Sequence, residues 1–121
     1  MTKEQFKQWL AKLKYAWESK KPEEATALYA GKCLYHESPF TPPYTNQEQI
    51  LELWRPVPMT QDKINVEFEI FAVTEDIGIT RWMATYDLIN QNKHVKADGI
   101  YVVHLNDVGL CDVFRRWKMV E

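Results

Sequence analysis

The chain has 121 residues, of which 45% are apolar and 26% are charged, and its formal net charge is −2. This size and composition predict one packed domain over residues 1–121, and the lack of a basic excess argues against nucleic-acid binding. No apolar run is long enough to cross a bilayer and the charged first segment does not resemble a secretion signal, so we expect a cytoplasmic protein without a membrane partner.

A first helix is predicted from the residue that follows Thr2 up to Lys20 and Lys21. Thr2 and Gln5 have the spacing of a capping box, in which each side chain bonds the backbone of the other residue. The apolar residues of this segment recur at helical spacing and form one face. They are Phe6, Trp9, Leu10, Leu13 and Trp17.

A short second helix and a strand are predicted next. Pro22 suits the first turn of the helix, and Gly31 could end it in a left-handed conformation. Ala25, Leu28 and Tyr29 would share its buried face. Residues 33–40, with the sequence CLYHESPF, then read as a strand that proline ends, because proline cannot donate to a ladder.

The third predicted helix begins after Asn46, which has Gln49 three residues later as a capping partner. Its apolar face carries Ile50, Leu53 and Trp54. Pro56 and Pro58 are expected to stop it.

From Lys63 onward the apolar residues alternate with polar ones, which predicts strands. Short turns at residues 75–78, 90–92 and 106–109 separate four such strands and predict an antiparallel meander. The order is therefore α-α-β-α-β-β-β-β, an α+β fold in which three helices cover one face of a curved sheet.

Three segments resemble parts of one known superfamily: they are ALYAGKCLYHESPF, PPYTNQEQILELW and ADGIYVVHLNDVGLCDVFRRW. The superfamily is that of the nuclear transport factor two-like proteins, which includes SnoaL-like polyketide cyclases and ketosteroid isomerases. The resemblance implies a cone-shaped, curved antiparallel sheet with a ligand pocket inside the cone. It also implies a homodimer formed through the outer face of the sheet, where this chain would place Met83, Ile100, Val102, Val113, Trp117 and Met119.

The sequence departs from the ketosteroid isomerases at the positions that carry their chemistry. The residue before Pro-Phe is a proton-shuttling aspartate in those enzymes and is Ser38 here. Leu13 aligns with their oxyanion tyrosine, and Tyr101 aligns with the aspartate that donates a second hydrogen bond to the oxyanion. A hydroxyl group without a neighbouring base cannot remove a proton next to a ketone, so we do not expect steroid isomerisation.

Strand alternation puts His36 and Ser38 on one face of the first strand, and Glu37 on the other face. The resemblance turns the Ser38 face into the cone. His36 would then be a general acid or base, or only a hydrogen-bonded histidine of a polar pocket. Glu37 would be solvated or paired.

The resemblance also sends Arg116 inward, where a charge needs a partner. Glu37, Asp98 or an anionic ligand could be that partner; alternatively, Arg116 reaches solvent at the open end of the cone. The expected catalytic residues are His36, Tyr101 and Arg116. The expected ligand-binding residues are Leu13, Trp17, Tyr29, Ser38, Trp54, Trp82, Tyr86 and Phe114.

The remaining candidate motifs predict structural roles. Cys33 and Cys111 are isolated, and the histidines lie on different elements, so neither a metal site nor a cofactor is expected. Asp98-Gly99 suits a bulge or a bend of its strand.

Two function classes follow from these features. One is a SnoaL-like enzyme that performs acid–base chemistry, such as isomerisation, cyclisation or dehydration, on a cyclic carbonyl or carboxylate compound. The other is a ligand-binding or protein-interaction scaffold without catalysis. In both cases the predicted partner is a small organic molecule with carbonyl or carboxylate oxygens, because the pocket would offer more donors than acceptors.

Overall fold

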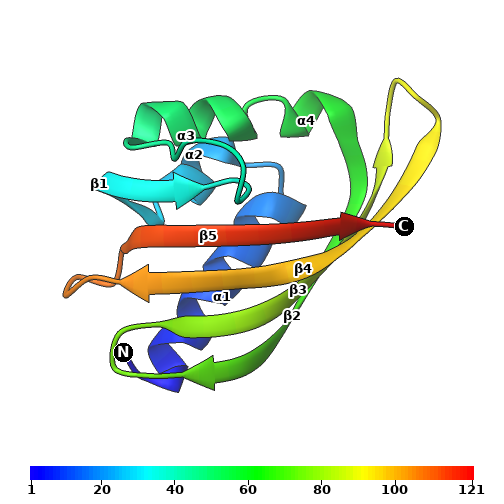
Figure 1. Cartoon of the computed structure of the whole chain (residues 1–121). Coiled ribbons are helices and arrows are strands. Elements are labelled where there is room, and N and C mark those ends of the chain that lie inside the picture. Colours follow the sequence, from blue (N-terminus) through cyan, green and yellow to red (C-terminus); the bar gives the residue numbers. More distant parts are fainter.

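The computed structural model describes residues 1–121 and contains four helices and five strands (Figure 1). In chain order these are α1 (Lys3–Glu18), α2 (Pro22–Thr26), β1 (Tyr29–His36), α3 (Gln47–Trp54), α4 (Val57–Thr60), β2 (Gln61–Val73), β3 (Gly78–Leu88), β4 (Lys93–Leu105) and β5 (Cys111–Val120). None of the helices has both the length and the apolar character that crossing a membrane requires.

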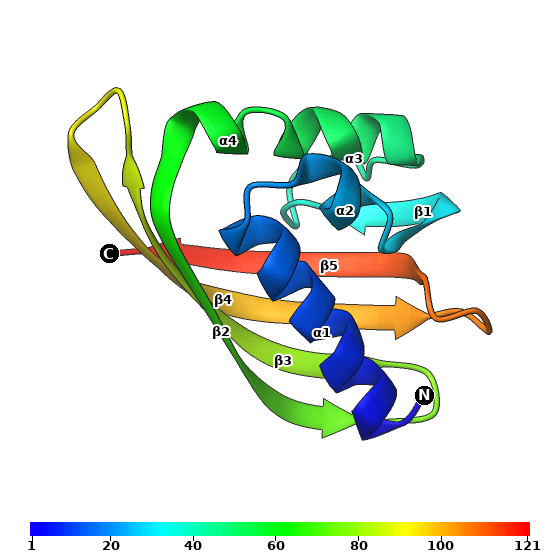
Figure 2. The ribbon, with the colours of Figure 1, turned by 180° about the vertical axis from the view of Figure 1, so that it is seen from behind.

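The five strands form one curved sheet in the order β1-β5-β4-β3-β2. The strands from β2 to β5 pair antiparallel, which confirms the predicted meander. The edge strand β1 pairs parallel with β5, so the sheet is not antiparallel throughout. Parallel strands need a long crossover, and here α3, α4 and the meander provide it. The helices lie on the concave face, which α1 crosses obliquely (Figure 2).

Two predicted helix caps are present. The Thr2 hydroxyl accepts from the Gln5 backbone N–H at 3.1 Å, and the Thr2 N–H donates to the Gln5 side chain at 2.8 Å. The Asn46 side chain accepts from the Gln49 N–H at 2.9 Å. These local bonds fix where α1 and α3 begin, and therefore which of their residues face the sheet.

The second helix is shorter than predicted, because Tyr29 opens β1 instead of extending α2. The Leu28 carbonyl accepts from the Cys111 N–H at 2.9 Å, which draws the chain into the sheet before another helical turn can form. Gly31 therefore lies in a strand and does not adopt the predicted left-handed conformation. The third helix ends at Trp54, just before Pro56, as predicted; Pro56 and Pro58 then start the extra turn α4, since proline is tolerated in a first turn.

One end of the concave face is filled with apolar side chains, and we call it the packed end. It is defined by Trp9, Leu13, Tyr29 and Phe114, all of which are buried. The Trp9 and Tyr29 rings meet edge to face at 5.7 Å, and the Tyr29 and Phe114 rings do so at 5.6 Å. Rings packed in this way leave no room for a ligand.

Candidate functional site

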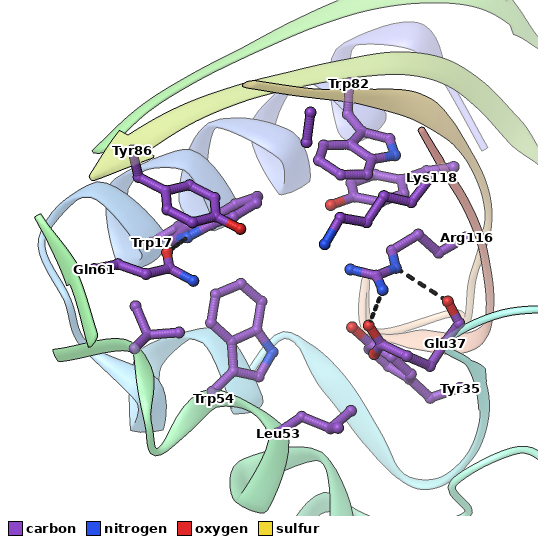
Figure 3. Close-up of a pocket in the computed structure, with 13 residues that line it drawn as sticks. Trp17, Tyr35, Glu37, Leu53, Trp54, Gln61, Trp82, Tyr86, Arg116 and Lys118 are labelled. Atoms are coloured by element: carbon purple, nitrogen blue, oxygen red, sulfur yellow. Dashed lines mark hydrogen bonds and ion pairs between the residues drawn. The ribbon is translucent and has the colours of Figure 1, made fainter. Parts of the chain in front are cut away.

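A cavity of about 200 Å³ opens farther along the concave face, between the sheet and the α3–α4 segment (Figure 3). It is smaller than the usual pocket for a drug-sized ligand. The lining residues are Trp17, Tyr35, Glu37, Leu53, Trp54, Val57, Gln61, Trp82, Tyr86, Ala97, Tyr101, Arg116 and Lys118.

Aromatic rings form most of the cavity wall. Trp82 and Tyr101 stack at 5.2 Å with an angle of 14° between their planes. On the opposite side, Trp17 from α1 and Trp54 from α3 meet edge to face at 5.5 Å. The Trp17 indole donates to the Gln61 side chain at 2.9 Å, which fixes its ring against the start of β2. Flat apolar surfaces of this kind suit a planar or cyclic ligand.

Gly99 allows Trp82 to lie flat on the sheet. A Cβ atom at position 99 would be 1.9 Å from the Trp117 carbonyl oxygen and 2.6 Å from Trp82 Nε1. Over this glycine, the Trp82 indole donates to the Trp117 carbonyl at 3.1 Å. The pairing of β4 runs without a shift through Asp98 and Gly99, so the predicted bulge is absent; the glycine serves a close approach instead.

An ion pair between Glu37 and Arg116 closes one side of the cavity (Figure 3). Tyr35 is paired with Phe114 in the parallel β1–β5 ladder, so the residues two positions farther on, Glu37 and Arg116, are also neighbours. The guanidinium contacts the carboxylate through Nη2, and its Nε donates to the Glu37 backbone carbonyl at 3.0 Å. Of the partners considered for Arg116, Glu37 is the one present; Asp98 instead pairs with Arg81.

Lys118 brings a second basic group to the cavity. It lies two residues after Arg116 on β5, opposite Gly99 of β4, and its amino group points into the cavity (Figure 3). Although the residue as a whole is exposed, its amino end lies among the lining side chains. It takes part in none of the ion pairs of the structure. Burial lowers the pKa of Lys118, Arg116 lowers it further, and Glu37 opposes this change.

Three tyrosines of the cavity wall keep their protons. Burial raises the pKa of Tyr35 and of Tyr101 well above the usual value, and that of Tyr86 to a smaller extent. At neutral pH all three are therefore neutral hydroxyl groups, and no side-chain or backbone partner bonds them. Each can donate a hydrogen bond to a ligand oxygen.

Many of the residues expected at the site lie around this cavity. They are Trp17, Trp54, Trp82, Tyr86, Tyr101 and Arg116. They come from α1, α3, β3, β4 and β5, so only the fold brings them together. Their roles toward a ligand stay predictions.

His36 and Ser38 lie outside the cavity, because the inward face of β1 carries Tyr35 and Glu37. The prediction had placed His36 and Ser38 on the inward face of the strand and Glu37 on the other face. Burial lowers the pKa of His36, as does Arg115, and its Nε2 atom is buried without a partner. The Ser38 hydroxyl accepts from the Phe40 N–H at 3.2 Å, which stabilises the turn after the strand.

Leu13, Tyr29 and Phe114 belong to the packed end and not to the cavity wall. Their faces were predicted to point inward, and they do. They lie deeper in the cone, however, where neighbouring rings occupy the space that a ligand would need.

The expected site did not include Tyr35, Glu37 or Lys118, although the sequence carries a signal for each. Lys32 is a charged residue, so its face of β1 should be the solvent face, which leaves Tyr35 and Glu37 on the inward face. Lys118 has the same strand parity as Arg116. Val57 and Gln61 were also missed, because α4 was not predicted, and Leu53 was expected on the apolar face of the third helix but not at the site.

Comparison with known proteins agrees with this architecture. The family model of the SnoaL-like domain matches residues 7–112. A search of curated proteins finds no match. Solved structures show the same nuclear transport factor two-like fold at low sequence identity.

Three of these structures cover nearly the whole chain. One, from Novosphingobium aromaticivorans and provisionally named scytalone dehydratase, is 16% identical with a TM-score of 0.77 over 98% of this chain and 85% of its own. SalBIII, an epoxide hydrolase/cyclase-like enzyme of pyran ring formation in salinomycin, is 14% identical with a TM-score of 0.82 over 98% and 95%. A protein from Bacillus subtilis, provisionally named isomerase, is 13% identical with a TM-score of 0.82 over 96% and 87%. The match of the family model over residues 7–112 shows that the chain belongs to the SnoaL-like domain family.

Proposed function

We propose that the cavity binds a small planar or cyclic molecule with carbonyl or carboxylate oxygens and performs acid–base chemistry on it. The proposal rests on one observation: a carboxylate, Glu37, and an amino group without an ion-pair partner, Lys118, line the same aromatic cavity. Structural neighbours are named as dehydratase, cyclase-like enzyme and isomerase, and such reactions move protons at carbon or oxygen.

Each polar group of the cavity has a role in this proposal. The N–H groups of Arg116 that Glu37 leaves free, together with the Tyr101 hydroxyl, donate to the ligand oxygens. Glu37 and Lys118 are the groups that accept or release a proton. With one carboxylate facing two basic side chains, the cavity favours an anionic or carbonyl ligand over an amine.

A thermal-shift screen tests the proposed ligand class. Benzoate and cyclohexanecarboxylate are compared with benzylamine and cyclohexylamine on the wild type, on Arg116→Met and on Arg115→Met, whose side chain lies on the opposite face of β5. We expect the acids to stabilise the wild type and Arg115→Met. In Arg116→Met, acid binding should weaken by roughly 1.5–3 kcal/mol and amine binding should strengthen, because Glu37 loses its partner. Equal responses to acids and amines in the wild type would contradict the proposal.

The same cavity also supports a function without catalysis, because Glu37 is already bound to Arg116 and its protonation would weaken that ion pair. Exchange of the α-hydrogens of cyclohexanone in D₂O separates the two functions. Acid–base chemistry predicts exchange that is faster than in buffer and slower in Glu37→Gln than in the wild type. A ligand-binding scaffold predicts no acceleration by either protein.

Ketosteroid isomerisation is not part of the proposed function. The reason is the size of the cavity and not the replacement of the proton-shuttling aspartate by Ser38. A carboxylate is present in the cavity, as Glu37. The volume of about 200 Å³ lies below the range for drug-sized ligands, so the cavity would enclose only part of a four-ring steroid. We therefore expect no turnover of a β,γ-unsaturated ketosteroid by the wild type.

We also propose that the chain forms a homodimer through the convex face of the sheet, opposite the helices. Trp117 is 42% exposed and Met119 is 77% exposed on this face, where Met83 and Ile100 are also partly accessible. Apolar groups gathered on one sheet face favour burial against a second copy. Light scattering at micromolar concentration should give the mass of a dimer, and Trp117→Lys should give a monomer. A monomeric wild type would refute the proposal.

A further inference from the structure

The amino group of Lys118 has an unusual position among the lysines of this protein. Most lysines near a carboxylate pair with it: Lys14 with Glu18, Lys20 with Asp62, and Lys96 with Glu121. In the cavity, the carboxylate of Glu37 is already paired with Nη2 of Arg116, whose Nε donates to the Glu37 backbone carbonyl. Lys118 therefore faces a second positive charge without a counter-ion of its own.

The surroundings of this amino group favour its neutral form. The charged groups that face it are the Arg116 guanidinium and the Glu37 carboxylate (Figure 3), and Tyr86 and Tyr101 line the same cavity. The tyrosines are neutral, and the charges of Glu37 and Arg116 offset each other. Burial lowers the pKa of Lys118, with Arg116 as the second cause. A lysine whose protonated form is disfavoured by burial and by a neighbouring cation is more nucleophilic than an exposed lysine.

We propose that Lys118 forms an imine with the carbonyl carbon of a small aldehyde or ketone held between the aromatic walls of the cavity. The inference rests on the proposed function for the cavity as a binding site, and it adds a covalent step and a substrate class. Trp82, Gly99 and Lys118 lie opposite one another on β3, β4 and β5, and the Trp82 indole lies over Gly99. The Trp82 ring provides the surface on which the carbonyl compound lies. The Tyr101 hydroxyl and the Arg116 guanidinium are the donors available for its remaining oxygens.

The step balances without an oxidant or a metal. The lone pair of the Lys118 nitrogen attacks the carbonyl carbon, and the carbonyl oxygen takes one of the two protons of the amine to give a carbinolamine. The nitrogen then releases a proton, the C–O bond breaks and the hydroxyl leaves as water with a proton. The products are one imine and one water. Protonation of the imine makes the adjacent C–H acidic, and Glu37 is the nearby carboxylate that can accept that proton.

Reductive trapping tests the inference. The full-length protein is incubated at neutral pH with a limiting amount of benzaldehyde and sodium cyanoborohydride, which reduces an imine to a stable secondary amine. Peptide mass mapping then locates the benzyl group. We expect at least a tenfold preference for Lys118 over each exposed lysine, since the cavity holds the aldehyde beside an amino group whose protonated form is disfavoured.

Two matched variants test whether the labelling depends on Lys118 itself or only on the number of lysines in the protein. Lys118→Arg keeps the positive charge but cannot form the imine, so the fast labelling should disappear. Lys96→Arg changes an exposed lysine that is paired with Glu121, and it should leave the labelling of Lys118 unchanged. Labelling that is spread evenly over the lysines, or an equal rate in Lys118→Arg and the wild type, would overturn the inference.

A parallel binding measurement separates this inference from the proposed function. Benzoate has the size of benzaldehyde but cannot form an imine. If benzoate stabilises the protein while Lys118 is not trapped, the imine is wrong and the ligand cavity stands. If Lys118 is trapped and benzoate competes with the trapping, both hold.

Discussion

The packed end and the cavity end of the concave face use the same kinds of side chain for opposite purposes. Phe114 is 1% exposed and contacts neighbouring rings on several sides, whereas Trp54 is only half-buried and its one aromatic contact is with Trp17. On β5 the change from one end to the other takes two residues, from Phe114 to Arg116. An inward aromatic ring is therefore not evidence of a ligand site; its depth in the cone decides which role it has.

The largest effect should come from Phe114→Ala. Removing a fully packed ring should lower the free energy of unfolding by about 3–5 kcal/mol, because the surrounding rings cannot fill the space that the Phe114 ring leaves. Urea denaturation measures this change. Phe71→Ala, at a site that is 56% exposed on β2, is the control and should change stability by less than about 1 kcal/mol. Similar losses in both variants would remove the distinction between packed and open positions.

The next effect should come from Gly99→Ala. The added methyl group would lie 1.9 Å from the Trp117 carbonyl oxygen, so the strands or the Trp82 ring must move. We expect a loss of about 1–3 kcal/mol in unfolding free energy, together with a weaker response to benzoate. Gly31→Ala is a matched control, because its Cβ would have no atom within 4 Å. A stable Gly99→Ala protein with an unchanged ligand response would contradict the role of Gly99 in shaping the cavity.

Trp54→Ala should separate binding from stability. Its edge-to-face contact with Trp17 contributes about 0.5–1.5 kcal/mol beyond area burial, so the loss of stability should be well below that of Phe114→Ala. The benzoate response in the thermal-shift assay should nevertheless be largely lost, since one wall of the cavity is removed. A retained response would place the ligand elsewhere.

The smallest effect should come from Lys118→Met. Because the pKa of Lys118 is lowered in the folded protein, the unfolded chain binds more protons between that lowered value and 10.5, the ordinary value for lysine. The charged form therefore destabilises the fold at low and neutral pH, and this penalty disappears as pH rises toward 10.5. The variant should be more stable than the wild type at pH 7 by about 0.5 kcal/mol or less, since solvent screens the exposed residue.

Denaturation at several pH values between 7 and 10 tests this sign. The gain of Lys118→Met over the wild type should shrink with rising pH. Lys96→Met corrects for the general loss of a positive charge at a residue on the opposite face of the sheet. A gain that grows with pH would mean that the pKa of Lys118 is raised in the folded protein.

Local signals predicted most of the fold. The caps at Thr2 and Asn46, the period-two alternation after Lys63 and the short turns depend only on nearby residues, and the structure contains all of them. Strand alternation placed Phe114 and Arg116 on one face of their strand, and the resemblance to the family turned that face inward, where Arg116 lies.

Features that depend on distant contacts could not be predicted in this way. The end of α2 is set by the bond from Cys111 to Leu28, which are far apart in the sequence. The pairing of Glu37 with Arg116 requires β1 to lie parallel to β5, and alternation within β1 does not contain that information. His36 was predicted on the inward face of β1, where Tyr35 and Glu37 lie instead. An error of one residue in the alternation of a strand moves every side chain to the opposite face.

The placement of the five tryptophans has a spectroscopic consequence. Trp17, Trp54 and Trp82 line the cavity, whereas Trp9 is buried at the packed end and Trp117 lies on the convex face. Indole emission depends on local polarity, so a molecule that displaces water from the cavity should change the fluorescence of the first three residues directly. Trp9 provides an internal reference, and Trp117 reports on the convex face. The protein thus carries its own optical probes for occupancy and for assembly, and neither measurement needs an attached label.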